Sequence, residues 1–163
     1  MNAPYTKLQI WLHWLIFLAI AVQFIAHEPM SDAWDKVEHG GEIAFDPLVF
    51  SHVVLGGLIF LLVLVRIVAR FRFGAPELPA EEPPMLRMLA ALTHLVLYAL
   101  MILMPVSGAV AWFGGVEAAG EAHEVMKALM LIFVGLHVVG ALFHQFVLKT
   151  NIMERMKRPG GVA

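Results

Sequence analysis

The sequence contains no cysteine. Disulfides, thiolate zinc sites and iron–sulfur clusters are therefore excluded, as is haem attached covalently through a Cys-x-x-Cys-His run. A metal centre in this chain would need other ligands. The sequence has eight histidines among its 163 residues, a high number for so apolar a chain.

Charged residues are also scarce, at 15%, while hydrophobic residues make up 60% and the mean hydropathy is +0.79. A soluble domain of this size needs more polar residues to cover its surface. The net charge is −2 and there is no basic patch with interleaved aromatic residues, so no nucleic-acid partner is expected. The composition indicates one domain, residues 1–163, whose outer surface is solvated by the lipid bilayer.

Four apolar stretches are each near or above the ~20 residues that cross a bilayer core. They cover residues 8–26, 47–69, 88–113 and 122–148. Backbone groups in lipid must be satisfied internally, so these stretches should be helices. We therefore predict an all-α integral membrane four-helix bundle. Pro105 and Gly108 predict a kink in the third helix, which could end soon after them.

Basic residues gather on one side of the predicted bundle. If the N-terminus is cytoplasmic, nine of the eleven Lys and Arg residues lie on that side, and only Lys36 and Lys127 lie outside. The positive-inside rule then predicts that both termini of this multi-pass membrane protein are cytoplasmic. The proline-rich segment 73–84 is expected to be a cytoplasmic linker. The outer segment 27–46 is polar and, with the start of the fourth stretch, carries most of the acidic residues.

Six histidines fall in or at the ends of the predicted spans, where ionisable side chains are costly and usually functional. They are His13, His52, His94, His123, His137 and His144. The other two, His27 and His39, lie in the outer segment and are expected to be solvated loop residues.

Helix direction sorts four of these histidines into two layers. His52 lies near the outer end of the second span and His123 at the outer start of the fourth. His137 follows fourteen residues later, on the same helix face and ~21 Å further in, at the depth of His13. Each layer thus has imidazoles from two helices, as axial ligation of an iron porphyrin requires. We predict two haems b, with His52 and His123 binding the outer iron and His13 and His137 the inner iron.

Taken singly, these features have simpler explanations. A lone histidine inside a membrane is as readily a hydrogen-bonded helix contact as an iron ligand. Gly56 and Gly140 would let a flat macrocycle lie close to the backbone, but alone they are better explained by helix packing. Arg66 falls on the face of the inner layer and Lys127 near His123, so each is a candidate partner for a haem propionate. Arg66 alone is better explained as an anchor at the membrane edge.

Several runs of the sequence occur in a familiar order. They are LQIWLHW at 8–14, SHV at 51–53 with Gly56, Arg66 and Arg70, THL at 93–95 with Tyr98 and Pro105, and HE, GLH and LFH at 123–124, 135–137 and 142–144. Together they cover nearly the whole chain and resemble the bacterial cytochrome b561 family. This resemblance implies four helices, two non-covalent haems b and electron exchange with a quinone, and it supports the same two ligand pairs.

One branch of that family, the superoxide oxidases, takes an electron from superoxide outside and reduces ubiquinone near the inner haem. The length and histidine layout here are similar to that branch, which makes a quinone-linked oxidoreductase the expected enzyme class. The resemblance puts His144 at the quinone end, where it and His94 would assist proton transfer. The acidic outer segments lack the positive field that attracts superoxide, and suit a basic periplasmic cytochrome better.

Two other classes stay open. A haem-bearing membrane anchor for a dehydrogenase or hydrogenase predicts that a large soluble subunit co-purifies with the chain. A transporter or channel that uses histidine for metal or protons predicts a colourless protein.

Overall fold

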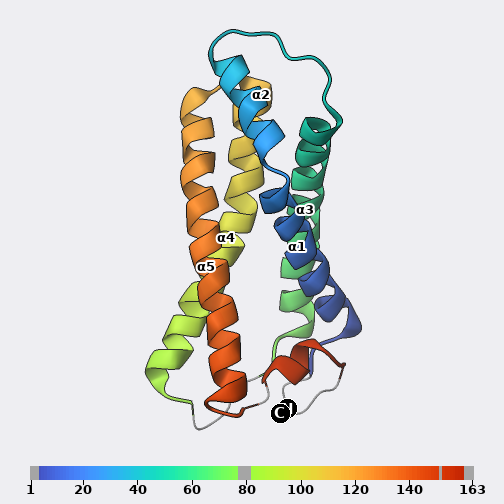
Figure 1. Cartoon of the computed structure of the whole chain (residues 1–163). Coiled ribbons are helices and arrows are strands. Elements are labelled where there is room, and N and C mark those ends of the chain that lie inside the picture. Colours follow the sequence, from blue (N-terminus) through green and yellow to red (C-terminus); the bar gives the residue numbers. More distant parts are fainter. Residues whose placement is uncertain (1–3, 77–81, 151, 160–163) are drawn as a thin grey trace.

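The structure, a computed structural model, describes residues 4–76, 82–150 and 152–159. Within these ranges every regular element is helical (Figure 1). The elements are α1 (Lys7–Ile25), α2 (Glu28–Glu38), α3 (Pro47–Phe73), α4 (Pro84–Gly114), α5 (Glu117–Phe146) and the short 3-10 helix η1 (Ile152–Met156). α1, α3, α4 and α5 are long and apolar enough to cross a membrane. The prediction of an all-α bundle with four spans is confirmed.

The helices extend beyond the predicted spans at their polar ends. α1 agrees with its stretch to within one residue, whereas α3 continues four residues further, to Phe73, and α4 begins four residues earlier, at Pro84. α5 begins five residues earlier, at Glu117. These added turns contain charged residues and prolines, which a hydropathy pattern leaves out. Of the predicted linker, residues 77–81 with Pro79 lie outside the described residues.

α4 runs through Pro105 and ends at Gly114, one residue beyond the predicted end of the third span. Proline removes one backbone donor and the helix can resume beyond it. The actual end is marked by Gly115, which has a φ of 64° in the left-handed region. Glycine adopts that conformation without the steric cost that a side chain brings.

Polar side chains fix the start of α1 and α3. Thr6 Oγ1 accepts from the Gln9 backbone N–H at 3.3 Å, and Gln9 Oε1 accepts from the Thr6 backbone N–H at 2.9 Å. This reciprocal capping box satisfies two amides that the helix leaves free. Asp46 caps α3 by accepting from the Leu48 N–H at 2.7 Å. Gln9 Nε2 also donates to the Gly74 carbonyl at 2.9 Å, which ties the start of α1 to the end of α3.

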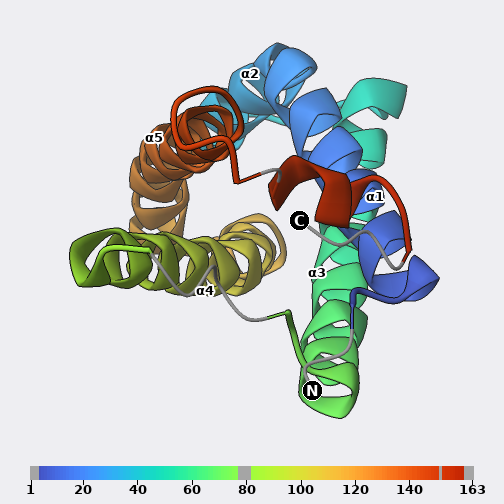
Figure 2. The same ribbon diagram turned by 90° about the horizontal axis from the view of Figure 1, so that it is seen from below.

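The bundle consists of two helix pairs. α1 packs mainly on α3 and α4 mainly on α5, with fewer contacts between α3 and α4. Figure 2, seen along the bundle, shows the four helices arranged around a common axis. Each pair has its own hydrophobic cluster of buried residues: Ile16, Ala19, Ile59 and Val63 between α1 and α3, and Leu97, Leu100 and Met130 between α4 and α5.

The outward surface of the bundle is apolar. Trp11 of α1 is 74% exposed, Phe71 of α3 86% and Phe146 of α5 70%, among many other large hydrophobic side chains. Exposed apolar surface of this extent is rare on soluble monomers. It is the surface expected of helices that face lipid tails.

The outer segment is not a loop throughout, because α2 occupies Glu28–Glu38. Pro29 in its first turn has a backbone angle suited to a helix start. α2 crosses one end of the bundle (Figure 1). Its polar composition hid it from the hydropathy pattern, although apolar residues recur at helical spacing. These residues are Met30, Ala33, Trp34 and Val37.

Gly120 of α5 is the point at which Trp34 of α2 rests on the bundle. A Cβ atom at position 120 would lie 2.7 Å from Trp34 Cζ2. We therefore expect Gly120→Ala to displace α2 and to lower the free energy of unfolding by ~1–3 kcal/mol. The measurement is the thermal midpoint of the purified protein in detergent. Gly135→Ala, on the same helix with open space around it, is the control and should leave the midpoint unchanged. An equal loss in both variants would contradict this packing role.

Candidate functional site

A cavity of about 510 Å³ lies at the end of the bundle that α2 covers. This volume is in the range of small-molecule and cofactor sites. His52 of α3 and His123 of α5 both line it, so the fold brings the two predicted outer histidines to one site. Gly56, Gly57 and Gly108 also line it, which leaves room beside the helix backbones.

His123 is held in the state that a metal ligand needs. Its Nδ1 atom lies 2.9 Å from the Met104 carbonyl oxygen, which can only accept, so Nδ1 carries the proton and donates it. Nε2 then keeps its lone pair. Metal-binding histidines are commonly oriented by such a second hydrogen bond to a carbonyl. The absence of a side chain at Gly108 leaves room for the His123 ring, because a Cβ there would lie 3.1 Å from it.

His52 has an unfilled hydrogen-bonding position. Its Nδ1 atom is buried and has no partner among the described residues, while its backbone carbonyl accepts from Gln23 Nε2 at 2.9 Å. Leaving a buried polar atom unsatisfied costs ~1–3 kcal/mol, so such an atom points to a group or water that completes the site. The unpartnered imidazole, the free Nε2 of His123 and the glycine-lined cavity fit a haem between the two rings.

At the other depth, His13 of α1 and His137 of α5 face each other with ring centroids 6.0 Å apart. A first-row metal binds an imidazole nitrogen at ~2 Å, so two rings on opposite sides of one iron have centroids roughly 6 Å apart. The spacing of His13 and His137 therefore fits a shared iron.

His94 of α4 also joins the inner layer. Its ring centroid is 5.0 Å from that of His137, which is short for two rings that share an iron. Its Nδ1 donates to the Ala90 carbonyl at 2.6 Å, so its Nε2 lone pair is free. His94 thus lies beside the predicted inner ligand pair, as its assignment to the inner region requires.

Arg66 of α3 joins three helices at the inner layer. It donates from Nη1 to the Gln9 carbonyl at 2.8 Å and from Nε to the Tyr98 hydroxyl at 3.1 Å. Nη2 lies 3.4 Å from His13 Nδ1, a long contact in which the ring nitrogen must accept, because a guanidinium only donates. Iron binding through His13 Nε2 would require this long contact to open. Arg66 is thus a half-buried cation next to the inner layer, and its propionate role stays a prediction.

The outer cavity, like the inner layer, has a basic side chain beside it, but this one forms an ion pair. Lys127 lines the cavity and its Nζ lies 2.5 Å from Glu124 Oε2. This partly exposed pair contributes little to stability. It does offset the positive charge of Lys127, so binding of a propionate by Lys127 would compete with Glu124.

The two histidines of the outer segment differ in their surroundings. His39 is exposed, as expected, at the end of α2. His27 was expected to be a solvated loop residue and is instead half-buried, lining the outer cavity with Nδ1 2.9 Å from the Phe24 carbonyl. The difference arises because α2 folds back over the bundle and carries its first residues to the cavity.

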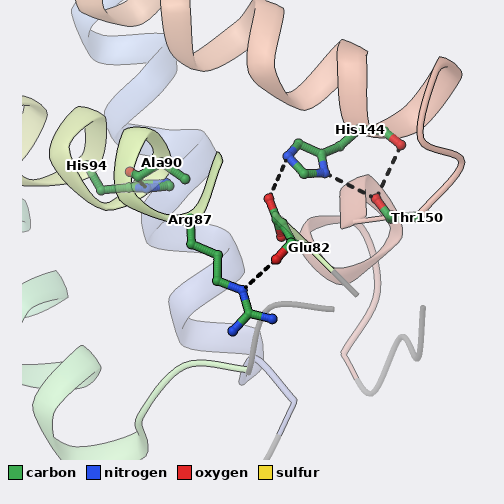
Figure 3. Close-up of polar contacts among 6 residues, drawn as sticks. All are labelled: Glu82, Arg87, Ala90, His94, His144 and Thr150. Carbon is green, nitrogen blue, oxygen red and sulfur yellow. Dashed lines mark hydrogen bonds and ion pairs between the residues drawn. The ribbon is translucent and has the colours of Figure 1, made fainter. Parts of the chain in front are cut away.

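At the inner end, His144 is 8% exposed and its Nε2 lies 3.0 Å from Glu82 Oε1 (Figure 3). Glu82 is itself 6% exposed and was not among the predicted site residues. Its only signal in the sequence was a carboxylate in a segment expected on the basic side. The structure therefore adds an acid to the predicted quinone end.

Comparison with known proteins gives consistent matches along the chain. The family model described as "Prokaryotic cytochrome b561" matches residues 4–159. Cytochrome b562 of Cereibacter sphaeroides is 40% identical over 155 residues, covering 95% of this chain and 96% of that protein. A probable superoxide oxidase, CybB of Yersinia pestis, is 30% identical over 180 residues, with 96% and 97% covered. Cytochrome b561 homolog 1 of Escherichia coli K12 is 23% identical over 173 residues, with 93% and 96% covered.

Proposed function

The chain belongs to the prokaryotic cytochrome b561 family of haem b membrane cytochromes, and from this we propose that it binds two haems and carries electrons from the outer side of the bacterial inner membrane to a quinone at the inner side. Its four apolar helices agree with a multi-pass bacterial membrane protein. When bound, haem supplies the reversible one-electron chemistry of its iron.

The observation that carries this proposal is the division of the histidines into two layers. In each layer one imidazole comes from the α1–α3 pair and the other from α5, so a bound group would bridge the two helix pairs. His52 and His123 share one cavity, and His13 lies 6.0 Å from His137 between ring centroids. In this proposal the four imidazoles would hold the two haems, which would supply one-electron transfer.

The quinone end is proposed at His144. It follows His137 by seven residues on the same face of α5, which corresponds to ~10 Å along the helix. His94 lies beside His137, with their ring centroids 5.0 Å apart. An imidazole can donate and accept a proton through its ring nitrogens, so His144 and His94 are the groups proposed to supply protons as ubiquinone is reduced.

Two electron donors are supported by different observations. The first candidate donor is superoxide, proposed because one relative, 30% identical, is described as a probable superoxide oxidase. The outer surface supports a second candidate, an electron-transfer or anchor subunit that serves a basic periplasmic cytochrome, dehydrogenase or hydrogenase. Exposed carboxylates there include Glu28, Asp32, Asp35, Glu38, Glu117, Glu121 and Glu124.

A reduced-minus-oxidised absorption spectrum tests the cofactor. We expect a b-type α band and about two haems per chain after pyridine extraction. A colourless protein would favour the transporter alternative and contradict the proposal. The same preparation then serves to separate the donors.

Salt dependence of haem reduction distinguishes the two donors in stopped-flow mixing. A negative surface repels superoxide and attracts a basic protein, and added salt screens both effects. Raising the ionic strength from about 20 to about 200 mM shortens the distance over which charges act. If superoxide is the donor, this change should speed haem reduction. If a reduced basic cytochrome is the donor, the same change should slow it. Reduction by neither would contradict both.

A further inference from the structure

A buried acid–base pair joins two distant segments at the inner end of the bundle. Glu82 lies just before α4, and His144 lies in the last turn of α5 (Figure 3). Their side chains are only 1% and 10% exposed, and Glu82 Oε1 is 3.0 Å from His144 Nε2. Burying two ionisable groups is costly unless they interact, so their close approach constrains how they hold protons.

The two groups together must hold one proton. Two lone pairs at 3.0 Å would repel, so the pair is either a carboxylate with an imidazolium or a carboxylic acid with a neutral imidazole. Thr150 fixes the other ring nitrogen, because its hydroxyl donates to the His144 carbonyl at 3.2 Å. Its single hydrogen is thereby used, and His144 Nδ1, 3.4 Å away, must donate to Oγ1. The pair therefore gains and loses its proton through Nε2 and the carboxyl group.

The carboxyl group is not saturated by the protein. Oε2 is buried and has no hydrogen-bond partner among the described residues, and Oε1 approaches Nε2 at an ion-pair distance without hydrogen-bond geometry. Arg87 Nε donates to the backbone carbonyl of Glu82 at 3.1 Å, which anchors the acid at the start of α4. A contact that only fastened the two segments together would be expected to satisfy both oxygens. The unfilled hydrogen-bonding capacity of Oε2 suits a carboxyl group that takes up and releases a proton.

We propose that Glu82 is a positioning residue that holds His144 and resupplies it with protons from the cytoplasmic side during quinone reduction. The inference rests on the proposed quinone site. Quinone takes two electrons from reduced haem iron and two protons to form quinol. Each proton that a quinone oxygen takes is the one held by the Glu82–His144 pair, and the pair then takes up the next proton through the Glu82 carboxyl group.

The test compares two electron acceptors with haem-replete, pre-reduced protein in stopped-flow. Short-chain ubiquinone needs protons, whereas ferricyanide accepts one electron and no proton. Glu82→Gln should slow haem oxidation by ubiquinone by ~100-fold, the lower end of the ~10²–10⁴-fold that a positioned acid–base group contributes, and leave oxidation by ferricyanide unchanged. Glu82→Asp, which keeps the carboxyl group, should recover part of the lost rate. Deuterium oxide should slow the wild-type reaction with ubiquinone and not that with ferricyanide.

The matched control is Glu154→Gln, which makes the same change at a half-exposed carboxylate of η1 that pairs with Lys157. It should react with both acceptors as the wild type does. Equal slowing of both acceptors by Glu82→Gln, or no slowing with ubiquinone, would overturn the relay and leave a structural role. If Glu82→Gln loses haem, Glu82→Asp and the solvent isotope effect decide, and absence of both effects overturns the relay. Wild-type protein that reduces ferricyanide but never ubiquinone would instead contradict the proposed function itself.

Discussion

Replacing His137 by alanine is expected to leave the purified protein with about one haem in place of two, because the inner iron loses one of its two proposed ligands. His52→Ala should do the same to the outer site. The remaining haem should keep its b-type spectrum, since the two layers share no proposed ligand. Haem content per chain, measured after pyridine extraction, checks this expectation.

The double variant His52→Ala with His137→Ala should bind essentially no haem. His39→Ala is the control, because His39 is exposed and bonds through Nδ1 only to the Asp35 carbonyl, at 2.7 Å. It should keep both haems. A double variant that retained both would refute the two-layer assignment.

His144→Ala is expected to slow ubiquinone reduction by ~100-fold while the haem content stays at the wild-type value. The physical reason is that alanine removes the proposed proton donor beside the quinone and leaves the four proposed iron ligands intact. Stopped-flow oxidation of the reduced haems by ubiquinone measures the effect, with ferricyanide as the reference acceptor. Unchanged kinetics with ubiquinone would remove the role of His144.

The double variant of Glu82→Gln with His144→Ala extends this measurement. If Glu82 acts only through His144, the double variant should be no slower than His144→Ala alone, because effects of residues that act as a unit do not add. Additive losses would mean that Glu82 reaches the quinone by another route.

Hydropathy predicted the four long helices because lipid imposes the same requirement on every spanning residue. The depth of each histidine followed from helix direction and the constant rise per residue. That argument predicted that His13 would meet His137, and their ring centroids are 6.0 Å apart. Both arguments rest on one physical rule that governs a whole segment.

The features that the sequence analysis missed depend on contacts between distant segments. α2 is polar and is held by Trp34 against Gly120, a contact that hydropathy does not register. Glu82 lies in a proline-rich segment, and its partner His144 is 62 residues further along the chain. Such pairs depend on where the linker packs against the bundle, and a single sequence gives no rule that predicts this position.

The pairing of helices has a consequence for how the protein matures in the cell. The hydrophobic clusters lie within the α1–α3 pair and within the α4–α5 pair, while the proposed iron ligands come from both. A ligand that binds only the assembled form stabilises it by mass action. In cells starved of porphyrin or iron, we expect the two helix pairs to separate more readily and membrane proteases to degrade more of the chain.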